Sequence, residues 1–234
     1  MRPKQWIKNF FVFAALIFSK KFIYLPYLIK TLHAFICFCL ISSSVYILND
    51  IVDEKKDKLH PKKKTRPIAA GVVEKKEAII FLIILIPITL IFSIYVDVYF
   101  FMILSFYLIN NILYTFKLKH MVIIDVMSIA AGFIFRVVGG ALAIGVIVSP
   151  WILVCTMLLS MFLALSKRRN ELIILDNNAG NHREILKEYS LPFIDNMLST
   201  ITASIVMAYS LYTFFAYTEK YMMLTIPFVL YGIF

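Results

Sequence analysis

The chain has 234 residues, of which 61% are hydrophobic, and its mean hydropathy is +0.84. A soluble domain of this length is nearer half apolar, so the composition excludes an ordinary water-soluble enzyme. The formal charge of +10 does not indicate nucleic-acid binding, because the basic residues lie in short segments between apolar runs and follow the rule for membrane topology. Cys37, Cys39 and Cys155 are odd in number and lie inside apolar runs, which argues against a disulfide framework.

Eight apolar runs are predicted to cross a bilayer, because runs of about 17–25 residues match its thickness. The first run is short, and we expect Lys20 and Lys21 to reach the interface and let it span. The last run is still apolar where the sequence stops, so we expect a C-terminally truncated chain. The sequence thus predicts an all-α, multi-pass transmembrane bundle forming a single domain over residues 1–234. The runs are Asn9–Ser19 (extending to Phe22), Leu25–Ile51, Ala78–Tyr95, Tyr99–Phe116, Val122–Ile144, Pro150–Leu165, Phe193–Tyr217 and Tyr221–Phe234.

The distribution of Lys and Arg predicts the orientation of these runs. With the N-terminus inside, 19 of the 24 basic residues fall in inside segments, and four fall in outside segments. Arg136 is the remaining one and lies within a run. Basic loops stay on the cytoplasmic side, so we expect the N-terminus and the basic loops in the cytoplasm and the protein in the cytoplasmic membrane.

The second run ends in a regular set of acidic residues. Asp50, Asp53 and Asp57 follow spacings of three and four residues, which place them on one helical face, with Asn49 beside them. Three carboxylates on one face repel each other, and the end of a membrane helix adds a desolvation cost. Bound Mg²⁺ removes both objections, since it takes oxygen ligands from carboxylates and substrate phosphates. The pattern therefore predicts a metal–diphosphate site, with solvated helix-end charges as the alternative.

A basic loop follows the acidic set. Arg66 suits a phosphate group because a guanidinium binds phosphate oxygens in a bidentate way, and a lysine acts as a point charge. The run Lys62–Lys64 precedes it and is explained equally well as a topology signal.

Two ionisable residues are expected inside the fifth run. Asp125 and Arg136 are 11 residues apart, close to three helical turns, so they share a face. An ionisable residue inside a membrane helix indicates function by default, and a buried structural ion pair is the alternative. The following GGALAIG segment is rich in small residues, which favours close helix packing.

Several of these segments resemble a known family. The N-D-x-x-D-x-x-x-D spacing resembles the first aspartate-rich motif of the UbiA superfamily of intramembrane prenyltransferases. Across the whole chain, the similarity is greatest to the decaprenyl-phosphate phosphoribosyltransferase branch. It is carried by RPKQWIKN, NDIVDEKKDKLHPKKKTRPIAAG, YTFKLKHMVIIDV, GFIFRVVGGALA and LALSKRRNEL.

The resemblance implies a UbiA-type bundle with a ninth helix in the intact family. It also implies Mg²⁺-dependent transfer of phosphoribose from 5-phosphoribosyl 1-diphosphate to a polyprenyl phosphate, with release of diphosphate, in cell-wall biosynthesis. Most superfamily members carry a second aspartate-rich motif after the sixth helix, where this chain has KRRNELIILD. A basic cluster there suits a substrate with an extra phosphate group.

The candidate residues combine the motif with the resemblance. The resemblance implies that Lys8 is a phosphate ligand, although interfacial anchoring explains it equally well. It also implies a role for Lys117, which a topology signal explains equally well. We predict Asp50, Asp53 and Asp57 as catalytic, and these three with Asn49 as metal ligands. The predicted substrate-binding residues are Lys8, Tyr46, Lys62, Arg66, Lys117, Lys119, Asp125, Arg136, Lys167, Arg168, Arg169 and Glu171.

Two other functions remain as alternatives. A UbiA-type enzyme that joins a prenyl diphosphate to an aromatic or glycerol-phosphate acceptor would use the same metal motif. A non-catalytic transporter or lipid-binding protein would carry midplane polar residues or internal repeats, and the sequence shows neither. The sequence predicts neither the prenyl chain length nor the oligomeric state.

Overall fold

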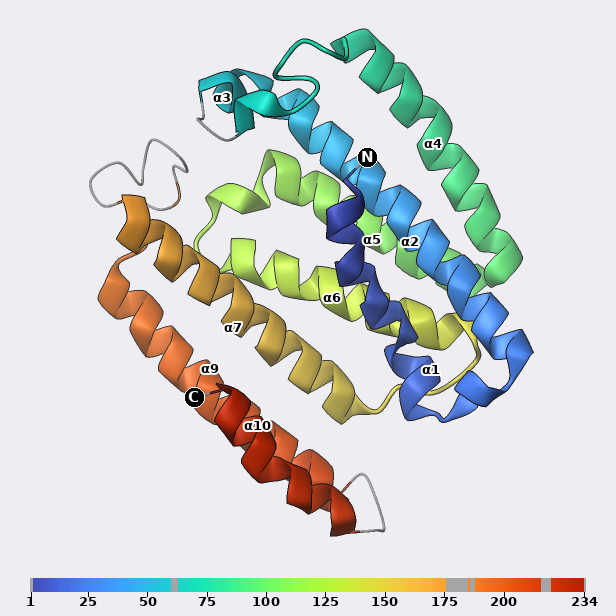
Figure 1. Ribbon diagram of the computed structural model, residues 1–234, viewed down its shortest axis with the longest axis vertical. Coiled ribbons are helices and arrows are strands. Elements are labelled where there is room, and N and C mark those ends of the chain that lie inside the picture. The colour runs from blue at the N-terminus through green and yellow to red at the C-terminus, as the bar shows by residue number, and fades with distance from the viewer. Residues whose placement is uncertain (1, 60–62, 176–184, 186–187, 216–219, 234) are drawn as a thin grey trace. The chain divides into compact units, whose positions relative to one another are not determined.

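The computed structural model describes residues 2–59, 63–175, 185, 188–215 and 220–233, and all regular structure within them is helical (Figure 1). The all-α expectation is therefore confirmed for the described residues. The α-helices are α1 (Ala14–Phe18), α2 (Leu25–Val52), α3 (Glu54–Leu59), α4 (Lys75–Val96), α5 (Val98–Phe116), α6 (Ile124–Ala143), α7 (Pro150–Leu175), α9 (Leu191–Phe215) and α10 (Ile226–Ile233). The 3₁₀ helices are η1 (Pro3–Phe13), η2 (Lys21–Ile23), η3 (Lys63–Thr65), η4 (Leu118–His120) and η7 (Lys220–Thr225).

The chain divides into two compact units. The first contains Met1–Leu118 and Phe135–Ile147, and the second contains Lys119–Ile134 and Val148–Phe234. Helix α6 therefore contributes its second half to the first unit and its first half to the second unit.

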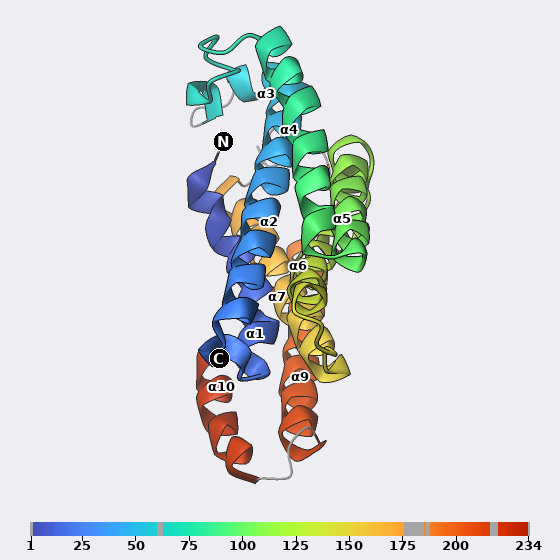
Figure 2. The same ribbon diagram turned by 90° about the vertical axis from the view of Figure 1, so that its right-hand side faces the viewer.

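The first unit is built on α2, which packs against η1, α4 and α5. Figures 1 and 2 show α2 and α4 lying side by side along their length. In the core, the ring of Phe38 meets those of Phe100 and Tyr107 edge-on, with centroids 5.8 and 5.5 Å apart. Edge-to-face aromatic pairs of this kind add stability beyond the area that they bury.

Glycines let other segments approach α6 closely in the first unit. A Cβ atom at Gly140 would lie 1.9 Å from the carbonyl oxygen of Val12, and one at Gly139 would lie 2.8 Å from the ring of Phe38. The small-residue segment is thus the place where η1 and α2 pack against α6, as the sequence predicts.

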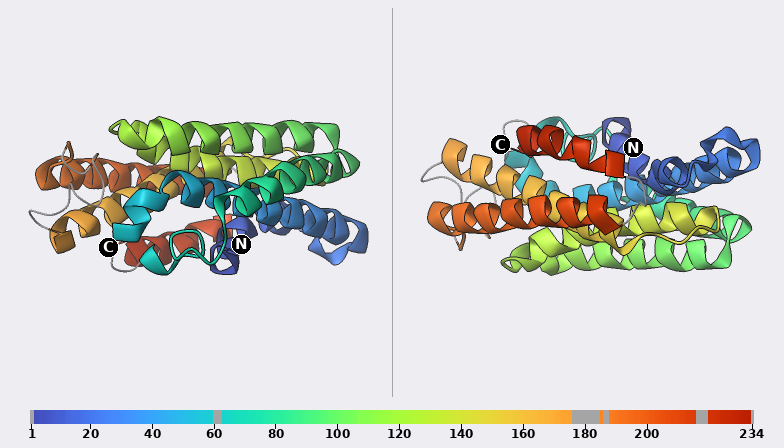
Figure 3. Two further views of the ribbon diagram at one scale, coloured as in Figure 1. Left: turned by 90° about the horizontal axis from the view of Figure 1, so that it is seen from above. Right: turned by 90° about the horizontal axis from the view of Figure 1, so that it is seen from below.

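The second unit is centred on the pair α7 and α9. Val126 of α6, Leu165 of α7 and Ile194 and Ile201 of α9 are buried together in its core. Helix α10 packs against α9, and the right-hand view of Figure 3 shows the two helices.

Six helices of the described residues are long and apolar enough to cross a membrane: α2, α4, α5, α6, α7 and α9. Helix α4 shows the membrane character most clearly, because Ile83, Ile91 and Phe92 are exposed on a helix that carries no charge after Glu77. Such a surface is stable in lipid and unstable in water. The first and last expected spans are helical too, but each is built from a 3₁₀ segment and a short α-helix.

Candidate active site

The acidic motif lies at the C-terminal end of α2 and continues into α3. Asp50 lies in the last turn of α2, Asp53 follows that helix as its C-cap, and Asp57 lies in α3. Backbone hydrogen bonds from Asp53 to Asn49 and from Asp57 to Asp53 keep the helical path nearly continuous. The chain therefore keeps the three carboxylates at the spacing that the sequence predicts.

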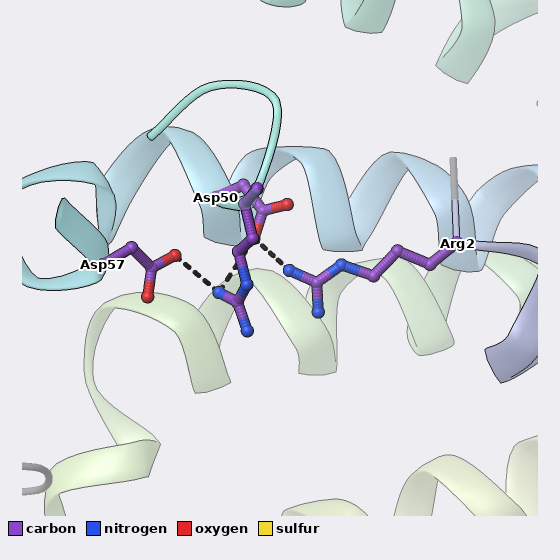
Figure 4. Close-up of polar contacts among 4 residues, drawn as sticks. Arg2, Asp50 and Asp57 are labelled. Carbon is purple, nitrogen blue, oxygen red and sulfur yellow. Dashed lines mark hydrogen bonds and ion pairs between the residues drawn. The ribbon is translucent and has the colours of Figure 1, made fainter. Parts of the chain in front are cut away.

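Two arginines hold the buried carboxylates (Figure 4). Arg66 Nη1 donates hydrogen bonds to Asp50 Oδ1 at 3.1 Å and to Asp57 Oδ2 at 2.5 Å. Arg2 donates to the same Oδ1 atom of Asp50, and its guanidinium lies 5.4 Å from the centre of the Tyr46 ring. Asp57 is only 3% exposed, and a buried carboxylate without a cationic partner would be strongly destabilising.

The position of Arg66 depends on a turn in the following loop. The amide of Ala70 donates to the carbonyl oxygen of Arg66, and the amide of Val72 donates to that of Pro67. Gly71 closes the turn at a φ of +74°, a left-handed conformation that glycine adopts without strain. This turn packs Ile68 and Ala69 into the protein and leaves the Arg66 side chain directed to the acids.

Asn49 supplies the strongest local sign of a cation site. Its Oδ1 atom is buried and has no hydrogen-bond partner among the described residues. A buried acceptor that lacks a donor is costly unless something else fills that role. Within the described part of the chain no three His, Cys, Asp or Glu side chains converge on one point, because arginines bridge the carboxylates. The all-oxygen donor set of Asn49, Asp50, Asp53 and Asp57 still fits Mg²⁺ by its chemistry.

A cavity of about 390 Å³ opens beside the acids within the first unit. Arg2, Tyr46, Asp50 and Arg66 form its polar end, and residues of the 67–73 turn and of α4 form the rest. Its size falls in the range of roughly 300–1,000 Å³ that ligand sites occupy.

Glu54 links α3 to the start of α4. Its carboxylate accepts hydrogen bonds from Lys58 Nζ at 2.6 Å and forms an ion pair with Lys75 Nζ at 2.5 Å. The hydrogen bonds from these two lysines lower the pKa of Glu54 to about 2, so this carboxyl group stays ionised at physiological pH. Helix α3 precedes the loop that carries Arg66, and α4 follows it. The ion pair between Glu54 and Lys75 therefore holds the two ends of this loop together.

A second buried polar cluster lies in the second unit. Asp125 Oδ2 accepts from Arg168 Nε at 3.1 Å, and Asp125 Oδ1 accepts from Tyr189 Oη at 2.8 Å. Tyr189 Oη also accepts from the backbone amide of Ile123 at 2.8 Å, and Arg168 Nη1 donates to Glu171 at 3.3 Å. Burial raises the pKa of the Tyr189 hydroxyl well above its usual range, so it remains a donor at neutral pH. This cluster pins the segment before α9 to the start of α6.

Arg136 takes part in a third cluster, in the first unit. Its Nε donates to Asn9 Oδ1 at 2.8 Å and its Nη2 to Tyr107 Oη at 2.9 Å, with the guanidinium 4.8 Å from the Tyr107 ring centre. The Asn9 amide in turn donates to Ser42 Oγ at 3.2 Å. The structure therefore gives Asp125 and Arg136 separate partners, although both lie on α6.

The remaining predicted site residues occupy different environments. Lys8, Lys117 and Lys167 are exposed, and Lys119 is half-buried. Arg169 donates to Asp195 at 2.6 Å, and Lys62 lies outside the described residues. Sequence reasoning missed Arg2, Tyr107 and Tyr189. No spacing pattern in the sequence points to these three residues, since each acts singly with a partner that is distant in the sequence.

Comparisons with known proteins agree with this architecture. The profile of the UbiA prenyltransferase family matches residues 9–173. The decaprenyl-phosphate phosphoribosyltransferases of Mycolicibacterium smegmatis and Corynebacterium glutamicum are each 31% identical to this chain over 92% of its length. The chain spans 69% and 66% of these two relatives.

Solved structures show the same fold. A UbiA homolog from Archaeoglobus fulgidus bound to GPP and Mg²⁺ superposes with a TM-score of 0.79, at 17% identity, over 99% of this chain and 82% of the homolog. A structure described as digeranylgeranylglyceryl phosphate synthase superposes with a TM-score of 0.71, at 18% identity, over 97% of this chain and 80% of the synthase. The resemblance and the multi-pass helical fold expected from the sequence are confirmed.

Proposed function

The chain belongs to the UbiA prenyltransferase family, and from this premise we propose that it is a membrane phosphoribosyltransferase. It would transfer 5-phosphoribose from 5-phosphoribosyl 1-diphosphate to a polyprenyl phosphate and release diphosphate. The similarity to two decaprenyl-phosphate phosphoribosyltransferases over 92% of the chain is the observation that carries this proposal. The protein would lie in the cytoplasmic membrane with this site on the cytoplasmic side.

The acidic motif would hold the donor's diphosphate through a metal. Asn49, Asp50, Asp53 and Asp57 are the oxygen donors available for Mg²⁺, and the unpartnered Asn49 Oδ1 supports this assignment. Mg²⁺ bound there would neutralise the diphosphate that leaves. The Mg²⁺ seen in the A. fulgidus homolog belongs to a protein only 17% identical, so it is consistent with the proposal without carrying it.

Arg66 would place the phosphate groups during the reaction. Its guanidinium already lies between Asp50 and Asp57 and can present further N–H donors to a phosphate oxygen. The bond from the anomeric carbon to the diphosphate oxygen breaks, and an oxygen of the lipid phosphate bonds to the same carbon. The acceptor phosphate is ionised at neutral pH, so the transfer requires no strong general base, and preorganised positive charge stabilises the departing diphosphate.

Diphosphate release in liposomes tests the proposal. With Mg²⁺, 5-phosphoribosyl 1-diphosphate and a polyprenyl phosphate, we expect lipid-dependent release that EDTA abolishes. Asp53→Asn should remove most of this turnover. Asp97→Asn is the matched control, because Asp97 caps α5 through the amides of Tyr99 and Phe100 and asparagine caps helices equally well. Turnover of a prenyl diphosphate with an aromatic or glycerol-phosphate acceptor, and none of phosphoribosyl diphosphate, would contradict the proposal.

A further inference from the structure

The cavity beside the acids has two chemically different halves. Its polar end presents the guanidinium groups of Arg2 and Arg66, which share Asp50. The other wall comes from the end of α2, the 67–73 turn and the start of α4, and its side chains are apolar except for that of Glu77. The apolar lining residues are Ile47, Pro67, Ile68, Val73, Ala78 and Phe81. A ligand that fits both halves carries a phosphate on an apolar chain.

We propose that this cavity binds the phosphate and the first isoprenyl units of the lipid acceptor, with Arg2 as a ligand of the lipid phosphate. The proposal rests on the proposed function, because it names the subsite of one of its two substrates. It assigns a substrate-binding role to the N-terminal segment.

Charge pairing supports the role of Arg2. Two arginines and two carboxylates, Asp50 and Asp57, balance each other at the polar end. Asp50 is the carboxylate that Arg2 contacts, so a cation bound by Asp50 would leave the Arg2 guanidinium in need of an anion. A phosphate monoester supplies that anion and accepts the paired N–H groups of a guanidinium.

The surface of α4 supports an apolar chain as the second half of the ligand. Phe81 lines the cavity and is 44% exposed, and Ile84 and Ile88 follow at helical spacing with exposures of 54% and 44%. Residues three and four apart share one helix face, so these side chains form an apolar stripe that continues from the cavity along a membrane helix. A prenyl chain can follow this stripe into the bilayer and remain in contact with apolar atoms.

The same wall disfavours a sugar phosphate. The hydroxyl groups of ribose would face mainly apolar side chains, such as those of Ile68, Val73 and Phe81, with the Glu77 carboxylate as the polar side chain on this wall. Burying a hydroxyl group without a hydrogen-bond partner is unfavourable. The cavity therefore discriminates between two ligands that both carry a phosphate.

Photo-crosslinking tests the site without turnover. The full chain in nanodiscs is labelled with farnesyl phosphate that carries a diazirine in its first isoprenyl unit, and the labelled peptides are mapped. We expect labelling within residues 63–81 that excess farnesyl phosphate prevents and that ribose 5-phosphate or inorganic phosphate does not. Equal protection by ribose 5-phosphate, or labelling confined to other helices, would overturn the assignment.

Two pairs of variants test the same site by kinetics. Val73→Trp fills the cavity, and Val72→Trp is its control because Val72 is 78% exposed and does not line the cavity. Arg2→Gln removes the proposed phosphate ligand, and Lys4→Gln removes a charge from an exposed neighbour. Val73→Trp and Arg2→Gln should raise the KM for the polyprenyl phosphate about tenfold and leave the KM for phosphoribosyl diphosphate within about twofold, which also shows that each variant folds.

The two proposals fail in different ways. Equal lipid KM values for each variant and its control would overturn the acceptor subsite and leave the phosphoribosyl activity standing. Specific labelling of the cavity in a protein that does not consume phosphoribosyl diphosphate would overturn the proposed function and support the lipid-phosphate site.

Discussion

At the scale of single residues, Arg66 contacts the same carboxylates that the proposed metal ion would use. Its guanidinium bridges Asp50 and Asp57, and it supplies the positive charge that these buried carboxylates require. A cation that binds the same oxygens must displace at least one of these contacts. In the proposed function, Arg66 would act against metal binding before the diphosphate arrives and in favour of the diphosphate afterwards.

This competition gives a prediction that needs no activity. Without diphosphate, Arg66→Gln should bind Mn²⁺ more tightly than the unmodified protein, by roughly tenfold, or 1.4 kcal/mol. Electron paramagnetic resonance of free and bound Mn²⁺ in nanodiscs measures the change. Lys55→Gln removes an exposed charge from α3 and serves as the control. Unchanged or weaker Mn²⁺ binding by Arg66→Gln would show that the arginine does not compete with the metal.

Tyr189 gives a second residue-scale prediction, in the second unit. Its hydroxyl group donates to Asp125 and accepts from the Ile123 amide, so Tyr189→Phe leaves two buried polar groups each short of a hydrogen bond. We expect a loss of about 1–3 kcal/mol in the free energy of unfolding. Denaturant titration in detergent measures it, with Tyr231→Phe as the control, because Tyr231 is 89% exposed. Because burial raises the pKa of Tyr189, the loss should be the same from pH 6 to pH 9.

The sequence predicts residues on one helix better than it predicts their partners. The spacing of the acidic motif predicts that Asp50 and Asp57 share a helical face, and in the structure Arg66 contacts both. The spacing of Asp125 and Arg136 indicates a shared helix, but Asp125 contacts Arg168 and Arg136 contacts Asn9. Periodicity describes a single helix, whereas partners depend on which other segments pack against it.

At the scale of elements, the segment η1 relies on the absence of a side chain at Gly140. The carbonyl oxygen of Val12 would lie 1.9 Å from a Cβ atom there, and a backbone atom cannot rotate away as a side chain can. This contact also fixes the segment that carries Arg2 to the acidic site and Asn9 to Arg136.

Gly140→Ala should therefore separate η1 from α6. We expect a destabilisation of about 3 kcal/mol or more, at the upper end of the cost of overpacking. Thermal unfolding in detergent measures it, and Gly232→Ala is the control, since no atom lies within 4 Å of a Cβ there. Equal melting temperatures for the two variants would contradict the tight packing of η1.

Some helices end where the apolar runs of the sequence predict, and others extend beyond the predicted end. Helix α2 ends at Val52, one residue beyond the expected run, whereas α7 extends to Leu175, ten residues beyond the expected end at Leu165. The added turns contain Lys167, Arg168, Arg169 and Glu171, and long charged side chains of this kind favour helix as strongly as apolar ones. Hydropathy marks where a helix leaves the membrane rather than where it stops.

At the scale of the whole chain, the charge distribution and the six apolar helices together predict one orientation. The stretch from Lys55 to Lys76, which joins α2 to α4 and includes the start of α4, carries nine of the 24 Lys and Arg residues, and the turn between α4 and α5 carries none. Moving the basic segment across the bilayer would transfer many charges, whereas the turn crosses at little cost. The basic segment also carries Arg66, so in the proposed function the orientation determines on which side the donor would have to be supplied.

Cysteine labelling in intact cells tests this orientation. Single cysteines are placed at Lys64 in the basic segment and at Tyr95 beside the turn between α4 and α5, after Cys37, Cys39 and Cys155 are replaced by alanine. A membrane-impermeant maleimide should modify Tyr95→Cys in intact cells and Lys64→Cys only after permeabilisation. The reverse pattern would place the acidic site outside the cell, away from a water-soluble phosphoribosyl donor made in the cytoplasm. It would then count against the proposed donor as well as against the orientation, because a highly charged diphosphate does not cross a bilayer unaided.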